Sequence, residues 1–78
     1  MERSEGDIRV KLEIVEDQED QMYKAFIRLY DGKRIGLQIY RTARTKEELL
    51  KALREMSDWP RWLGEPQNRL IKEILSSL

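Results

Sequence analysis

The chain of 78 residues contains no cysteine and no histidine. Without cysteine it can form neither a disulfide scaffold nor a thiolate metal site. Without histidine it lacks the commonest general base, the Ser-His and Cys-His nucleophile pairs and the usual zinc ligand. We therefore expect a protein that is not an enzyme and that uses no metal and no cofactor.

Long apolar stretches are missing as well. No run of the sequence approaches the roughly 18 consecutive apolar residues of a membrane span. The N-terminal residues Met-Glu-Arg-Ser-Glu-Gly-Asp contain no apolar signal core. We expect a cytoplasmic, intracellular protein that has no membrane partner.

The length and composition favour a single domain. Hydrophobic residues make up 40% of the chain and charged residues 38%, so one modest core is possible, without room for a deep enzyme cleft. Residues 1–6 are polar and show no periodicity, which predicts a flexible N-terminal tail. Residues 7–78 are expected to form one α+β domain.

Charge is distributed unevenly along the chain, although 15 basic and 15 acidic residues cancel. Residues 1–20 hold eight acids and three bases, a net charge of −5, whereas residues 21–44 hold one acid and six bases, a net charge of +5. Residues 45–78 hold six of each. A partner responds to the local potential, so this asymmetry says more about binding than the total does.

Three segments alternate between apolar and polar residues, the pattern of half-buried β-strands. They run from Ile8 to Ile14, from Met22 to Tyr30 and from Lys33 to Arg41. The acidic segment 16–21 lies between the first two and is expected to be a solvated loop. The pattern predicts a three-stranded antiparallel meander with one apolar face.

The turn between the last two strands decides which side chains share a face. A three-residue loop of residues 30–32, with Gly32 in the left-handed conformation, would place Ile27 opposite Ile35 and keep the aliphatic residues together. Pairing Val10 with Ile27 achieves the same for the first two strands. These registers would also align Arg9, Arg28 and Arg34 across the sheet.

The rest of the chain is predicted to be helical. The run Thr45-Lys46-Glu47-Glu48 is a capping box with Thr45 as N-cap. That helix is expected to end near Ser57, because Pro60 cannot lie in its interior. A connector over residues 58–64 leads to a second helix that begins near Pro66. The apolar stripes of the two helices comprise Leu49, Leu50, Ala52, Leu53 and Met56, and Leu70, Ile71, Ile74, Leu75 and Leu78.

Both helical stripes need an apolar surface, and the sheet offers one. The predicted architecture is therefore α+β, with a three-stranded antiparallel β-meander and two C-terminal helices packed on one face, β-β-β-α-α in two layers.

The opposite face of the sheet, here called the open face, combines basic and aromatic side chains. It should present Arg9, Lys11, Glu13, Val15, Met22, Lys24, Phe26, Arg28, Tyr30, Arg34, Gly36, Gln38 and Tyr40. Five bases against one acid give this face a predicted charge of +4. Burying those charges under helices would cost several kcal/mol each, so the face should meet solvent or a partner.

Our leading hypothesis is that the open face binds nucleic acid, either DNA or RNA. Cationic side chains neutralise phosphates, and exposed rings give stacking platforms for unpaired bases. The phosphate contacts would come from Arg9, Lys11, Lys24, Arg28 and Arg34, the stacking from Phe26, Tyr30 and Tyr40, and a base-edge contact from Gln38. The alternatives are a face that only keeps the domain soluble and a protein-interaction module, such as a regulatory or inhibitory adaptor of viral or mobile-element type.

Parts of the sequence resemble the arm-type DNA-binding modules of phage integrases. The likeness rests on Tyr23–Arg28, on the hairpin Asp31-Gly32-Lys33-Arg34 and on the helix start Thr45–Glu48, about 30 residues in all. It is an analogy of fold, which implies three strands followed by a helix and a DNA partner. The acidic segment 16–21 and the second helix depart from that pattern.

Three further features could carry contacts. The acidic segment 16–21 could hold calcium, although it lacks the glycine and the distant glutamate of an EF-hand. Trp59 and Trp62 in the connector could close the core or, if exposed, form a protein-binding hot spot. A homodimer could form through the sheet or through the helix that ends at Leu78.

Overall fold

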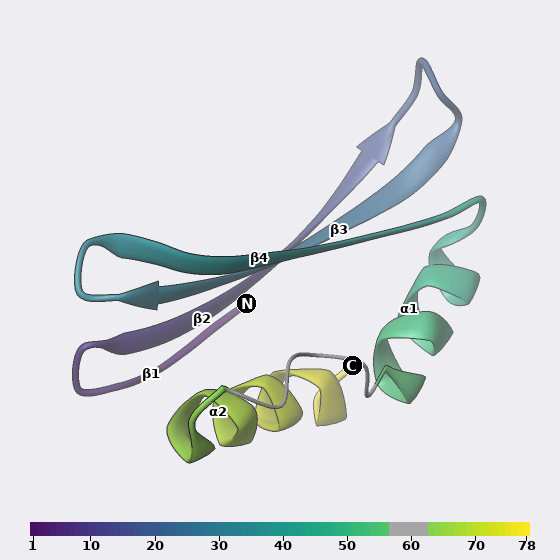
Figure 1. Ribbon diagram of the computed structural model, residues 1–78. Coiled ribbons are helices and arrows are strands. Elements are labelled where there is room, and N and C mark those ends of the chain that lie inside the picture. Colours follow the sequence, from purple (N-terminus) through teal and green to yellow (C-terminus); the bar gives the residue numbers. More distant parts are fainter. Residues whose placement is uncertain (57–62) are drawn as a thin grey trace.

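The computed structural model describes residues 1–56 and 63–78. Four strands are followed by two helices (Figure 1). Their bounds are β1 Glu2–Glu5, β2 Ile8–Asp17, β3 Met22–Asp31, β4 Arg34–Ala43, α1 Lys46–Glu55 and α2 Glu65–Ser76. The α+β class, the antiparallel sheet and the two C-terminal helices predicted from the sequence are confirmed.

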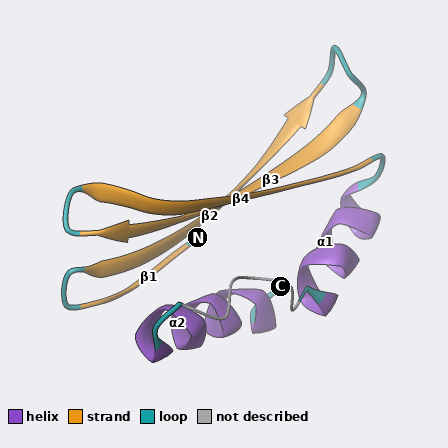
Figure 2. Cartoon of the chain, in the orientation of Figure 1, coloured by secondary structure: helices purple, strands orange, loops and turns teal. Residues whose placement is uncertain are grey.

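The strands form one antiparallel sheet in the order β1-β2-β3-β4, and both helices lie on the same side of it (Figure 2). The core between the two layers is entirely apolar among the described residues. It consists of Val10, Leu12, Ala25, Ile27, Leu29, Ile39, Leu49, Leu53, Met56, Leu63, Leu70, Ile71, Ile74 and Leu75. Burial of each large aliphatic side chain stabilises the fold by roughly 1.5–3 kcal/mol.

The sheet has four strands, so the prediction of three strands after a flexible tail is wrong by one strand. Glu2–Glu5 form β1, which pairs with β2, and Met1 continues the pairing because its ammonium donates to the carbonyl of Leu12 at 3.0 Å. All four β1 residues are exposed. A short strand without a buried face leaves no apolar alternation in the sequence, which is why the periodicity missed it.

The turn between β1 and β2 did leave a signal. Gly6 has φ +59° and is the first residue of a two-residue loop between the paired residues Glu5 and Ile8. Positive φ at that position is the requirement of a type II′ hairpin turn, which glycine meets without strain.

In the β2–β3 pairing, each side chain lies on its predicted face of the sheet, but the register differs from the prediction. Val10 lies opposite Leu29 and Leu12 opposite Ile27, a shift of two residues from the prediction. The cause is a tighter turn, because β2 continues to Asp17, which pairs with Met22. A shift by an even number of residues leaves every side chain on its predicted face.

The β3–β4 pairing departs further from the prediction. Ile27 lies opposite Ile39, and the strands continue to the pair Asp31–Arg34, so the loop is Gly32-Lys33 rather than residues 30–32. Gly32 has φ +64°, which confirms its predicted left-handed conformation.

A β-bulge near Leu29 and Tyr30 reverses the alternation at the start of β4. Beyond it, Tyr30 pairs with Ile35, and Ile35 is 58% exposed. Ile35 was predicted to be in the core and Arg34 on the open face, and both predictions are wrong for this reason.

The helices follow the sequence signals closely. The Thr45 hydroxyl accepts from the backbone N–H of Glu48 at 3.1 Å, which confirms the predicted N-cap of α1. Pro66 lies in the first turn of α2, as expected. The α1 stripe is narrower than predicted, since Ala52 is exposed. Most of the predicted connector, including Trp59 and Trp62, lies outside the described residues.

Within the described part of the chain, no helix is both long enough and apolar enough to span a membrane.

Candidate functional site: the open face and the basic edge

The open face carries the aromatic cluster that the sequence predicted. Phe26 and Arg28 of β3 point away from the helices, and the rings of Phe26 and Tyr40 lie 5.1 Å apart at an interplanar angle of 45°. The Arg28 guanidinium lies 5.1 Å above the Phe26 ring, and that of Arg9 lies 4.8 Å above Tyr30. Each guanidinium therefore makes a cation–π contact.

The predicted charge of +4 on this face is wrong, because carboxylates occupy the same face. The four bases there are Arg9, Lys11, Lys24 and Arg28, and the acids placed against them are Glu2, Glu13, Asp17 and Asp20. The strand β1 and the longer β2 supply Glu2 and Asp17, which the sequence reasoning had assigned to the tail and to the loop. Four bases against four acids leave the open face without net charge.

Arg28 is held on both sides at the centre of the face. Its Nη1 donates to Glu13 Oε2 at 2.9 Å, and its Nε donates to Gln38 Oε1 at 3.1 Å. Across the strands it faces Lys11 and Gln38 rather than Arg9 and Arg34. The predicted row of three arginines is therefore absent.

Arg9 also has its contacts within the sheet. Its side chain lies 3.6 Å from the Glu2 carboxylate, besides its contact with Tyr30. Among the residues that the structure describes, Lys11 is the one base of the open face without an ion pair.

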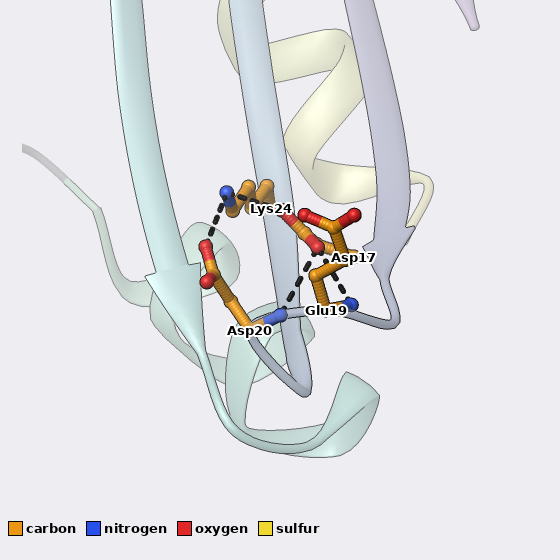
Figure 3. A network of polar contacts seen from close by, with 4 residues as sticks. All are labelled: Asp17, Glu19, Asp20 and Lys24. Atoms are coloured by element: carbon orange, nitrogen blue, oxygen red, sulfur yellow. Dashed lines mark hydrogen bonds and ion pairs between the residues drawn. The ribbon is translucent and has the colours of Figure 1, made fainter.

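A network of polar contacts at the β2–β3 turn neutralises Lys24, the remaining base of the open face (Figure 3). Lys24 Nζ donates to Asp17 Oδ2 at 2.6 Å and to Asp20 Oδ2 at 3.1 Å. Asp17 Oδ1 accepts from the backbone N–H groups of Glu19 and Asp20 at 3.1 and 3.2 Å. The acidic segment is therefore the end of β2 followed by a tight, solvent-exposed turn that is closed by its own hydrogen bonds.

These bonds shift the protonation of both partners. The Lys24 ammonium, followed by the Asp20 backbone N–H, holds the pKa of Asp17 below its ordinary value of 3.8. Hydrogen bonds to Asp17 and then Asp20 raise the pKa of Lys24 above 10.5. In residues 1–56 and 63–78 no group of three acids is arranged to hold a metal ion, so the structure gives the calcium alternative no support.

Unneutralised charge lies instead along one edge of the sheet. We call residues 32–46, which comprise β4 and its flanks, the basic edge. It contains five bases (Lys33, Arg34, Arg41, Arg44 and Lys46) and no acid. Within the described residues, Lys33, Arg34, Arg44 and Lys46 are exposed and make no ion pair.

The basic edge coincides with a strand that has a neighbour on one side only. In the order β1-β2-β3-β4, the ten-residue β4 pairs with β3 alone. Its centre, Ile35–Tyr40, carries no charge, and Ile35 and Tyr40 are 58% and 45% exposed. An unpaired strand edge presents a row of backbone N–H and C=O groups to solvent.

The opposite edge is acidic and tied down. In β1, Glu5 forms an ion pair with Arg69 of α2, which raises the pKa of Arg69, and Glu2 pairs with Arg9. The uneven charge of the sequence thus becomes a gradient across the sheet. Ion pairs neutralise the carboxylates of β1 and most of the charges between β2 and β3, whereas Lys33, Arg34, Arg44 and Lys46 make no ion pair in the part of the chain that the structure describes.

The structure divides the predicted binding residues into two groups. Arg9, Lys11, Lys24, Phe26, Arg28, Tyr30, Gln38 and Tyr40 share the open face, whereas Arg34 lies at the start of the basic edge. The edge itself was missed as a site. Its signal, a 15-residue stretch without an acid, was present in the sequence.

The chain matches no family model, no curated protein and no solved structure.

Proposed function

We propose that this protein is a non-enzymatic protein-interaction module that binds an extended, acidic segment of a partner along the basic edge. The observation that carries the proposal is the position of the unneutralised charge. Three of the four cations of the open face already have carboxylate partners, whereas Lys33, Arg34, Arg44 and Lys46 make no ion pair among the described residues.

The edge strand supplies the affinity of such a complex. An extended segment that adds to a sheet gains main-chain hydrogen bonds along its length, and this mode of recognition recurs among peptide-binding domains. β4 offers ten residues, about 33 Å at ~3.3 Å per residue. Its uncharged centre, Ile35–Tyr40, leaves the backbone approachable.

The flanking bases supply the selectivity for acidic partners. Complementary charges accelerate association and disfavour wrong partners. They also argue against a second copy of this chain as the occupant. Antiparallel pairing of two β4 strands about the point between Leu37 and Gln38 would set Arg34 of each copy opposite Arg41 of the other, and like charges so placed destabilise a sheet.

A selection experiment tests the proposal. A displayed library of random ten-residue peptides is selected on the protein at about 50 mM salt and sequenced. We expect enrichment of Asp and Glu, with binding that weakens at higher salt. A lack of binders, or binders without acidic enrichment, would overturn the proposal.

A matched pair of charge reversals locates the binding surface. Lys33→Glu with Arg34→Glu should abolish the acidic enrichment or shift it toward basic peptides. Lys51→Glu with Lys72→Glu makes the same charge change on exposed helix positions and should leave the selection unchanged. Equal effects of the two pairs would show that net charge rather than the edge selects the peptides.

A second candidate function is binding of single-stranded nucleic acid on the open face. It is favoured by one observation, the pair of half-buried Phe26 and exposed Tyr40 rings with the Arg28 guanidinium above Phe26. Affinity for a 20-nucleotide oligo-dT or oligo-U should then fall steeply with salt. Arg28→Ala with Arg34→Ala should weaken it without unfolding the domain, and unchanged binding by that double variant would refute this function.

A further inference from the structure

A cavity opens beside the start of β4, at the end of the sheet where the two glycine turns meet. Its volume is about 160 Å³, and its lining comprises Leu29, Tyr30, Asp31, Gly36, Leu37, Leu63 and Gln67. Leu29 belongs to the core, and Leu63 is buried just before the N-cap of α2. The cavity is thus continuous with the core and borders the strand that we propose as the binding edge.

Gly36 keeps this cavity uncovered. The backbone of Gly36 is not in the left-handed region, and a Cβ placed there would meet only the Leu29 carbonyl oxygen, at 3.8 Å. Neither backbone conformation nor close approach therefore requires glycine at this position. The consequence of glycine is that β4 carries no side chain at a point where it lines the cavity.

The cavity has the size of one side chain. Apolar cavities of about 150 Å³ hold a benzene-sized group. Side chains of an added strand alternate between the two faces of the sheet, so a residue placed opposite Leu37 would point toward the helix layer and toward Leu63. In strand-addition complexes the main chain provides affinity and such pockets provide specificity.

We infer that the cavity is a socket for one large apolar side chain of the acidic segment bound on the basic edge. This inference rests on the proposed function and adds the feature that sets the register of the bound segment. Leu37, which the anchoring residue would lie opposite, is three residues from Arg34 and four from Lys33. The anchoring residue should therefore be accompanied by an acid about three or four positions away, on the side that faces those two bases.

The peptide selection described above also tests this inference. Peptides enriched on the unmodified protein should share one Leu, Ile, Met or Phe position at that fixed distance from an acid. Gly36→Leu, whose side chain would occupy the socket, should abolish the apolar preference and leave the acidic enrichment. Gly36→Ala, whose Cβ fits the available space, should retain both.

The outcomes separate the two proposals. Acidic enrichment without a shared apolar position on the unmodified protein would overturn the socket and leave the proposed function standing. Absence of acidic enrichment would overturn the proposed function itself. Thermal unfolding of each variant shows whether it is folded.

A measurement on the unmodified protein does not depend on the Gly36 variants. A selected peptide should shift the methyl resonances of Leu63 in NMR spectra, and the same peptide with alanine at the anchor position should not. Equal shifts with both peptides would overturn the socket.

Discussion

Arg28 and Glu13 form an ion pair of 2.9 Å on the open face, on the diagonal between neighbouring positions of β2 and β3. Diagonal cross-strand neighbours lie within reach of long side chains. Both side chains project from the same face of the sheet. The Glu13 carboxylate therefore neutralises the Arg28 charge that would otherwise attract an anion.

Removing that carboxylate should uncover the cation. We expect Glu13→Gln to raise the affinity for an oligo-dT 20-mer by about 1.4- to fivefold at low salt, the range of one exposed ion pair of roughly 0.2–1 kcal/mol. Fluorescence anisotropy against the unmodified protein measures the change. Glu16→Gln, an equal change in an exposed residue, serves as control. An unchanged affinity would show that phosphates do not approach Arg28 and would remove the second candidate function.

The same substitution at one isoleucine of β3 and one of β4 tests which side chains of these strands face the core. Ile27 is 1% exposed and Ile35 is 58% exposed. Ile27→Asp should lose at least about 3 kcal/mol, because it places an unpaired charge in the core. Ile35→Asp should change the stability by roughly 0.5 kcal/mol or less, as surface substitutions do. Urea unfolding of both variants measures the difference, and comparable losses would contradict the bulge.

The Asp17–Lys24 pair should make part of the stability depend on pH. The folded-state pKa of Asp17 is below its ordinary value of 3.8. Its contribution is therefore present above that value and is lost as the pH falls through the lowered pKa. For Lys24, with a raised pKa, the contribution is present below 10.5 and is lost only at still higher pH.

Asp17→Asn should therefore be less stable than the unmodified protein at pH 7, with a difference that narrows below about pH 4. Thermal unfolding at pH 7, 4 and 2.5 measures this difference. Glu19→Gln, in the same turn, should track the unmodified protein throughout. A difference for Asp17→Asn that persists undiminished at pH 2.5 would show that the charge of Asp17 is not its source.

The charge of the basic edge also predicts the association state. We expect sedimentation velocity at micromolar concentration and low salt to show a monomer, because two copies of β4 would bring arginines together. Screening by salt weakens such repulsion, so any self-association should increase with salt. A dimer that is stable at low salt would contradict the argument and favour the homodimer that the sequence left open.

Much of the fold could be predicted because local signals agree with one another. The alternation around Ile27, the cap at Thr45 and the early proline at Pro66 each act within a few residues, and the structure bears out all three. The strand β1 was not predicted, because its residues are all exposed and show no alternation of apolar and polar side chains. Its turn glycine, Gly6, was a local signal that went unused.

The sequence by itself determined which β3 side chains face the core, where both helices begin and that opposite charges are concentrated in different segments. Only the tertiary structure decided which of those charges meet. Register and the bulge join residues far apart in the chain, so a shift of two positions brings Glu13 to Arg28, while Lys33 and Arg34 make no ion pair within the described residues. Side chains alternate between the two faces along a strand, so the sequence alone shows which face each one occupies. The partner of a charged side chain depends instead on distances between residues that are set only when the chain folds.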